Sequence, residues 1–167
     1  VSLAGSYHAP LANEIYDYCI ASKESFPEDV MKTRLQQGLP TTFYTCCTEG
    51  YPNTFTFSPP AEAAFMGWHA AHKGYTGYLR WAYNCWVKDP LHDSRFRAWA
   101  AGDTYFVYPG PRSSIRFERL VEGIQDYEKI RLLKEEFAKT NNTAALNKLD
   151  HLLQSFDIAT LKTMPAA

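Results

Sequence analysis

The sequence predicts an α/β protein with parallel strands covered by helices, and in particular the C-terminal half of a (β/α)8 barrel. Predicted strands and helices alternate along the chain, which is the order found in βαβ units. The predicted strands are nearly continuous apolar runs, as expected for strands buried on both faces. Four such strands alone would leave two open edges. Half of a larger barrel is therefore the simplest prediction, and a small doubly wound open sheet is the alternative.

The first predicted elements are a strand and two helices. The apolar residues 1–4 begin without a Met or a preceding turn, as expected for a strand of a longer protein that is entered midway. Residues 14–22 (EIYDYCIAS) predict a short helix. Residues 25–38 predict a second helix, in which Ser25 and Glu28 have the spacing of a capping box.

The middle of the chain adds two strands with a helix between them. Residues 41–47 (TTFYTCC) and 77–86 (GYLRWAYNCW) predict the strands. Residues 58–74 predict the helix, with Ser58 as its N-cap and Gly74 at its end.

The last part of the chain predicts a strand followed by two long helices. Residues 103–110 (DTYFVYPG) predict the fourth strand, and the longest helix begins after Ser114 as its N-cap. A final amphipathic helix is expected over residues 143–156. We expect residues 1–140 to form the partial barrel and residues 141–167 to form a C-terminal helix and tail packed on it.

The composition argues against several classes of protein. Seventeen basic and eighteen acidic residues give a formal net charge of −1, and no basic block is present that would bind nucleic acid. No apolar stretch approaches the ~20 residues of a membrane-spanning helix. Aromatic residues make up 15% of the chain, with eleven Tyr and four Trp. Such rings suit the binding of sugars, or else a Tyr-rich core.

The unusual residues cluster at the predicted strand ends, where a (β/α)8 barrel has its active site. Arg80 is expected to point into a polar barrel interior beside a carboxylate, unless it lies at a strand end and reaches solvent. By alternation, Asn84 and Trp86 would then face the barrel mouth. They would combine a stacking face with a polar group, as sugar sites do. Trp81, on the other face, is a candidate for packing under a helix.

The second predicted strand ends in two adjacent cysteines. Neighbouring strand residues point to opposite faces, so Cys46 and Cys47 form a poor metal clamp. We expect one to line the barrel mouth and the other to pack beneath a helix, with residues 49–53 as a loop at the pocket rim. His69 and His72 share a helix face but have no evident third ligand, so neither a metal nor a cofactor is expected. The carboxylates near strand ends either face the pocket or form turns; they are Glu49, Asp89, Asp93 and Asp103.

Several motifs resemble one known family when they are taken together. They are YTCC (44–47), GYLRWAYNCW (77–86), GDTYFVYPG (102–110) and SSIRFERLVEGIQDYEKIRLL (113–133). They resemble the C-terminal part of the catalytic region in glycoside hydrolase family 123 and the related domain-of-unknown-function family 4091. The resemblance implies a (β/α)8 barrel that hydrolyses glycosides of N-acetylated amino sugars with retention. The substrate's own acetamido group then acts as the nucleophile, instead of an enzymic carboxylate.

The resemblance also guides the choice of site residues. The family's consecutive Asp-Glu pair, which orients the acetamido group and acts as acid/base, does not occur in these 167 residues. We expect that pair upstream of Val1, and we expect this segment to be inactive alone, with no catalytic residue of its own. The substrate-binding positions carried over from the family are Tyr44, Cys46, Trp81, Asn84 and Trp86. The residues that match the helix motif are read as structural; they are Arg116, Glu118, Asp126 and Glu128.

Two other functions remain open. The chain could be a carbohydrate-binding or scaffold domain without turnover, or a flavodoxin-like sheet whose function depends on its thiols. The expected partners are a carbohydrate substrate and either the missing N-terminal part of the barrel or a second copy. The resemblance favours a bacterial secreted or periplasmic protein.

Overall fold

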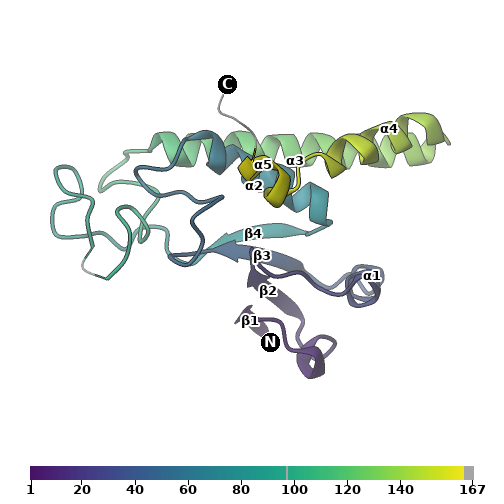
Figure 1. Cartoon of the computed structure of the whole chain (residues 1–167), viewed down its shortest axis with the longest axis horizontal. Helices are drawn as coiled ribbons and strands as arrows, with labels where there is room; N and C mark the ends of the chain where they lie inside the picture. The colour runs from purple at the N-terminus through teal and green to yellow at the C-terminus, as the bar shows by residue number, and fades with distance from the viewer. Residues whose placement is uncertain (97, 164–167) are drawn as a thin grey trace.

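The computed structural model describes residues 1–96 and 98–163, and it has one parallel sheet with helices packed against it (Figure 1). The strands lie side by side in chain order: β1 (Ser2–Gly5), β2 (Asp17–Ala21), β3 (Thr41–Thr45) and β4 (Gly77–Arg80). All three neighbouring pairs are parallel. The α/β class is therefore confirmed, and four adjacent parallel strands are consistent with part of a (β/α)8 barrel.

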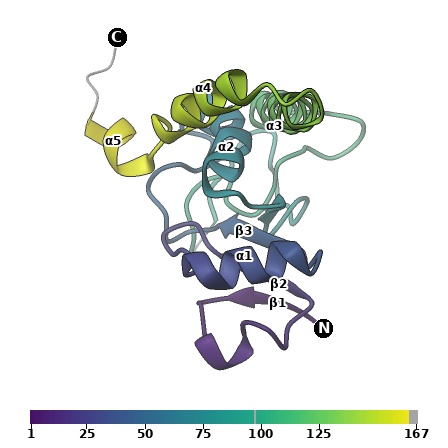
Figure 2. The same ribbon diagram turned by 90° about the vertical axis from the view of Figure 1, so that its right-hand side faces the viewer.

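One short 3-10 helix and five α-helices accompany the sheet in the described residues. They are η1 (Ala9–Leu11), α1 (Glu28–Gln36), α2 (Ala61–Lys73), α3 (Ile115–Lys139), α4 (Thr143–Gln154) and α5 (Ile158–Thr163). Figures 1 and 2 show α2 between the sheet and the outer layer of α3 and α4. No helix in the described residues has the length and apolarity needed to cross a membrane.

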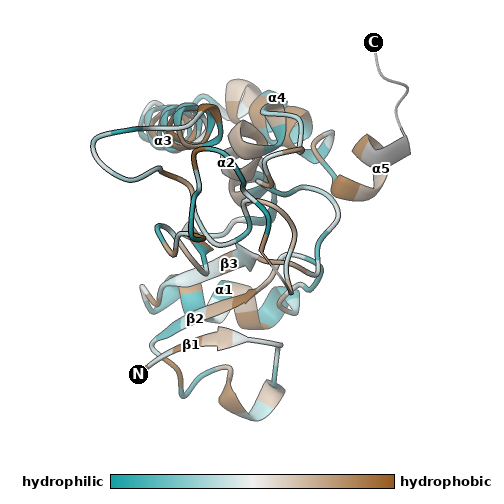
Figure 3. Ribbon diagram, turned by 90° about the vertical axis from the view of Figure 1, so that its left-hand side faces the viewer, coloured by the Kyte–Doolittle hydropathy of each residue, from teal (hydrophilic) through white to brown (hydrophobic). Residues whose placement is uncertain are grey.

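The hydrophobic core lies between the sheet and α2. Side chains alternate along each strand, so Tyr18 and Ile20 of β2 share a face with Phe43 of β3. All three are fully buried, and they pack with Met66 and Ala70 of α2. Figure 3 shows β2 coloured as largely hydrophobic and α3 with mixed colours, as expected for a core strand and an outer helix.

Residues 14–22 do not form the expected helix, because residues 17–21 are strand β2, which pairs with both β1 and β3. The turn before it is held by Arg34 of α1, whose side chain is fully buried. Its guanidinium donates to the carbonyls of Ala12, Ile15 and Tyr16 at 2.5, 2.9 and 3.1 Å. These carbonyls are therefore occupied by a side chain instead of by helical N–H groups.

The predicted strand over residues 103–110 is also wrong. Within it, only Tyr105 and Tyr108 make single antiparallel bridges, to Asn84 and Arg112. The third predicted strand, β4, is shorter than expected and ends at Arg80.

Apart from residues 14–22, the predicted helices are present, but two of their predicted caps are not. α1 begins after Pro27 and α2 after Pro60, and neither has a side-chain cap, so the roles expected for Ser25 and Ser58 are wrong. Ser114 does cap α3, because its hydroxyl accepts a hydrogen bond from the Phe117 N–H at 3.1 Å.

Helices α2 and α3 approach each other closely at two glycines. A Cβ on Gly67 would lie 1.9 Å from the Gly123 carbonyl oxygen, and one on Gly123 would lie 2.3 Å from the Ala64 carbonyl oxygen. Only hydrogen fits at either position. The close approach explains Gly123 in the helix motif, since a larger residue would separate the two helices.

Candidate substrate-binding site

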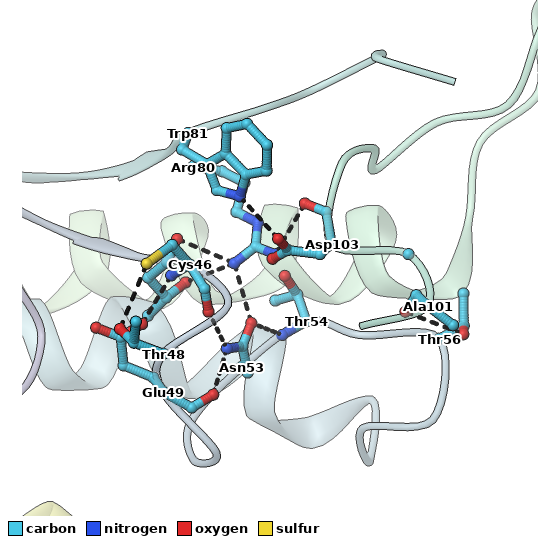
Figure 4. A network of polar contacts seen from close by, with 12 residues as sticks. Cys46, Thr48, Glu49, Asn53, Thr54, Thr56, Arg80, Trp81, Ala101 and Asp103 are labelled. Carbon is cyan, nitrogen blue, oxygen red and sulfur yellow. Dashed lines mark hydrogen bonds and ion pairs between the residues drawn. The ribbon is translucent and has the colours of Figure 1, made fainter. Parts of the chain in front are cut away.

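A buried ion pair lies at the carboxyl edge of the sheet (Figure 4). Arg80 ends β4, and its guanidinium forms an ion pair with the Asp103 carboxylate, with side-chain exposures of 5% and 0% respectively. The same guanidinium donates to the carbonyl of Asp103 at 3.0 Å, the carbonyl of Thr45 at 3.0 Å and Asn53 Oδ1 at 2.9 Å. A buried charge needs this degree of pairing.

Arg80 therefore has the expected carboxylate partner, but its side chain lies on the helix-covered face of the sheet and not on the face that was expected to line the barrel interior. It is in register with Thr45 and shares a face with Tyr78, which packs against the helix-covered core. The expected position in the barrel interior is wrong. The reason is that acceptors for its guanidinium come from the loops that cross the strand ends on the helix side.

The same network closes the loop after β3. The Asn53 amide donates to the carbonyls of Cys46 and Glu49 at 2.7 and 2.6 Å, and the Glu49 carboxylate accepts from the Cys46 N–H at 2.9 Å. We call residues 46–53 the β3 loop. The Arg80 guanidinium donates to the oxygen of the same Asn53 amide, Oδ1. The ion pair and the β3 loop are therefore one connected unit.

Trp81 is attached to this unit and carries an exposed aromatic surface. Its indole Nε1 donates to Asp103 Oδ2 at 3.2 Å, while 40% of the residue is exposed. The ring lies 5.3 Å from that of Trp99, edge to face, and Trp99 stacks on Phe96 at 4.9 Å. Trp81 therefore does not pack under a helix. Trp99 and Phe96 were missed because their segment has no regular pattern, and only the high aromatic content indicated them.

The other predicted pocket residues lie outside this network. Tyr44 is on the opposite face of the sheet, in register with Leu79, and burial raises the pKa of its hydroxyl. Asn84 forms a bridge with Tyr105, and the Trp86 indole donates to the Val107 carbonyl at 2.7 Å. Because β4 ends at Arg80, strand alternation does not determine where Asn84 and Trp86 point.

All four cysteines are free. Cys46 is half-buried and Cys47 is exposed, so the expectation that one packs beneath a helix is wrong. Partial desolvation and then the neighbouring Cys46 raise the pKa of the Cys47 thiol, and burial raises that of the Cys19 thiol to about 11. Reactive thiols have lowered pKa values, so these two do not favour a thiol function.

The exposed loop carboxylates have partners close in the sequence, whereas His72 of α2 bonds the Leu153 carbonyl of α4 at 3.0 Å. Asp89 contacts His92 at 2.9 Å and Asp93 contacts Arg95 at 2.7 Å, both at the surface. The hydrogen bonds from Arg95 lower the pKa of Asp93 to about 2. In the described residues, no group of three or more His, Cys, Asp or Glu side chains is arranged to hold a metal ion.

The helix motif makes structural contacts. Arg116 is buried and donates to the carbonyls of Thr54 and Gly102 at 2.5 and 2.8 Å, which joins the start of α3 to two loops at the strand ends. Asp126 accepts from the Trp68 indole of α2 at 3.1 Å. These contacts place α3 against the rest of the fold.

Parallel strands with a buried ion pair, a closed loop and exposed indoles at their carboxyl edge define an α/β protein of the barrel type, with its candidate site at the strand ends. The family model described as glycoside hydrolase 123, catalytic domain, matches residues 1–133, most of the chain. The chain belongs to this family.

Among solved structures, the chain is similar to a family 123 glycoside hydrolase from Clostridium perfringens, which was solved in a study of glycolipid glycan hydrolysis. The two are 29% identical with a TM-score of 0.77, and the match covers 92% of this chain. It covers 28% of the other chain, so this chain spans less than a third of that relative. A comparison with curated proteins gives no match.

Proposed function

We propose that this chain is part of the catalytic barrel of a glycosidase that acts on glycosides of N-acetylated amino sugars, by the retaining, substrate-assisted route. In this proposal the chain forms one wall of the sugar pocket and carries no catalytic residue. Residues 1–140 belong to the barrel and residues 141–163 pack on it, while the end of the predicted tail, residues 164–167, lies outside the described residues. Family membership supports the reaction class, and the relative's link to glycolipid glycans supports a carbohydrate substrate.

The observation that carries the proposal is the exposed Trp81 ring fixed to the buried ion pair. Sugars bind proteins through stacking on aromatic faces together with a few well-placed polar groups. Trp81 supplies such a face, and Trp99 packs edge to face beside it. We assign Tyr44, Cys46, Asn84 and Trp86 to the same pocket wall on the basis of the family motifs.

Tryptophan indole resonances test this assignment. The chain has four Trp, so four indole N–H signals can be assigned by single Trp→Phe variants and followed by ¹⁵N NMR. N-acetylgalactosamine is expected to shift the Trp81 and Trp99 signals. It should leave Trp68, which is bonded to Asp126 of α3, unchanged. Galactose, which lacks the acetamido group, is the matched control ligand. If Trp81 does not respond at any sugar concentration, this part of the wall is assigned wrongly.

A hydrolysis assay tests whether the chain carries catalytic groups in addition to a sugar-binding surface. Residues 1–167 are expected to release no sugar from a chromogenic N-acetylhexosaminide, because an adjacent Asp-Glu pair does not occur in this sequence. Turnover at a rate typical of enzymes would show that the chain contains the catalytic groups.

The same lack of an Asp-Glu pair favours a second candidate, a carbohydrate-binding or scaffold domain without turnover. It predicts sugar binding at Trp81 with no hydrolysis, even in a longer polypeptide that contains this chain. Hydrolysis by that longer polypeptide would exclude it.

A further inference from the structure

A groove runs along one open edge of the sheet, between β4 and α3. It has a volume of about 380 Å³, and of the described strands β4 alone lines it, through Gly77, Tyr78 and Arg80. Figure 1 shows β1 and β4 as the two outer strands. In the described residues β4 pairs only with β3, so its other edge has no strand partner. We call this site the β4 groove, and an unpaired edge of this kind is a template for another strand.

The helix side of the β4 groove is an apolar stripe of α3. Phe117, Leu120, Ile124 and Tyr127 line the groove and follow one another at spacings of three or four residues, as on one helix face. Ile124 lies in the middle of this stripe and is 51% exposed. In layered α/β folds, a helical stripe beside a strand edge packs on the next strand of the sheet. The groove therefore has the position of a fifth strand.

The polar side chains along the β4 groove already have partners. The Tyr127 hydroxyl donates to the Tyr75 carbonyl at 2.9 Å, and Arg80 is held by the ion pair described above. The Tyr78 hydroxyl hydrogen-bonds the Thr45 hydroxyl at 2.7 Å. The groove therefore offers apolar side chains together with the N–H and C=O groups of a strand edge. An extended segment with an apolar side chain at every second position matches both features.

The opposite edge of the sheet carries a strand of this kind. β1 (Ser2–Gly5) has four residues, as β4 does, and in the described residues it pairs only with β2. Leu3 is in register with the core residue Tyr18, so by alternation Val1 and Leu3 share the core side. Val1 is 89% exposed. Because β1 and β4 run in the same direction and have their free edges on opposite sides, β1 of one copy can pair in parallel with β4 of another.

Two such contacts would close a ring. If β4 of each copy pairs with β1 of the other, the two sheets give eight parallel strands, the number in a (β/α)8 barrel. A heterologous contact that closes in this way gives a ring instead of a filament and leaves no strand edge open. The formal net charge of −1 per chain opposes this association only weakly.

We propose that the β4 groove receives β1 of a second copy of this chain, so that two copies complete an eight-stranded parallel barrel. Val1 and Leu3 of that copy then pack against the apolar stripe of α3. The inference goes beyond the proposed function, because it concerns strand pairing and needs neither sugar binding nor hydrolysis.

Sedimentation equilibrium of residues 1–167 tests the association. The mass is expected to rise with concentration from 19.0 kDa to twice that value and no further. Ile124→Arg places a charge in the groove and should weaken the association about thirtyfold, as for a central interface residue. Leu132→Arg is the matched control, because Leu132 is 54% exposed on the same helix but does not line the groove. It should leave the association unchanged, and circular dichroism checks that both variants fold.

Amide hydrogen exchange of the unmodified chain identifies the strands that pair. Raising the concentration should slow exchange in both β1 and β4. Slower exchange in β4 without β1 would mean that another segment fills the groove, and would overturn the proposal. A chain that stays at 19.0 kDa, a series of larger oligomers, or an Ile124→Arg variant that associates normally would also overturn it. A monomer whose Trp81 indole responds to sugar leaves the proposed function standing, and a dimer whose Trp81 does not respond has the opposite meaning.

Discussion

Replacing Asp103 by Asn is expected to destabilise the fold strongly. The change keeps the shape of the side chain and removes its charge, so Arg80 becomes a buried cation without its counter-ion. Asn also has only one oxygen, whereas the carboxylate accepts from both Arg80 and the Trp81 indole. At least one of these two donors therefore loses its acceptor.

The burial of the pair sets the magnitude. Because the side chains are only 5% and 0% exposed, water cannot replace the lost partner. Removing one member of a buried pair costs about 3–5 kcal/mol of unfolding free energy. For a domain of this size each kcal/mol corresponds to about 2–4 °C, so the melting temperature should fall by roughly 6–20 °C.

Urea denaturation followed by circular dichroism measures the effect. Asp93→Asn is the matched control, because it removes the carboxylate of an exposed Asp–Arg pair and should leave the midpoint unchanged. The double variant Arg80→Met, Asp103→Leu leaves no buried charge but leaves the Thr45 carbonyl and Asn53 Oδ1 without the Arg80 donor, so it should recover only part of the loss. If Asp103→Asn behaves like Asp93→Asn, the Arg80 charge is solvated and the reasoning fails.

Three further predictions concern other parts of the fold. Gly67→Ala should lower the melting temperature, because the new Cβ would lie 1.9 Å from the Gly123 carbonyl oxygen. Overpacking of this kind costs about 1–3 kcal/mol, more than the higher helix propensity of Ala returns. A raised melting temperature would contradict the close contact. Ser114→Ala should lower the unfolding free energy by about 1 kcal/mol through loss of the α3 cap, measured in urea, and an unchanged value would argue against that cap. The free energy of unfolding should fall as the pH drops from 6.5 to about 4, because His69 binds a proton in the unfolded chain but not in the folded protein. At 1.36 kcal/mol per pKa unit, the loss amounts to about 3 kcal/mol. The same pH series with His69→Phe should lack that step, and an identical slope in both proteins would refute the assignment.

The helices were easier to predict from the sequence than the strands. The α3 helix has both a local cap at Ser114 and apolar residues at helical spacing. Strand β2 has no such local signal. Four of its five residues are buried, so it shows no alternation, and Ile15, Tyr18 and Cys19 fit a helical spacing as well. Its pairing with β1 and β3 is a long-range property.

The opposite error at residues 103–110 has a related cause. Tyr105 and Phe106 are buried, as residues of a strand would be, but their rings lie under the Arg116 guanidinium at 5.4 and 5.8 Å. A strand needs a continuous ladder of backbone hydrogen bonds to a neighbouring strand. The local sequence does not show that Tyr105 finds only a single bridge, to Asn84.

The candidate site was predicted in part. A charged residue in an apolar strand implies a carboxylate partner, and this holds for Arg80. The identity of that partner does not follow, because Asp103 lies 23 residues further along the chain in an irregular loop. Trp99 could not be linked to Trp81 for the same reason.

The attachment of Trp81 to Asp103 has a consequence for ligand affinity. An exposed aromatic side chain normally loses rotational freedom when a ligand stacks on it, which costs about 0.5–1.5 kcal/mol per side chain. The indole of Trp81 is already held in one orientation by a carboxylate that is itself immobilised by Arg80. A ligand at this ring would therefore meet a preorganised surface, and its dissociation would be slower than from a freely rotating tryptophan.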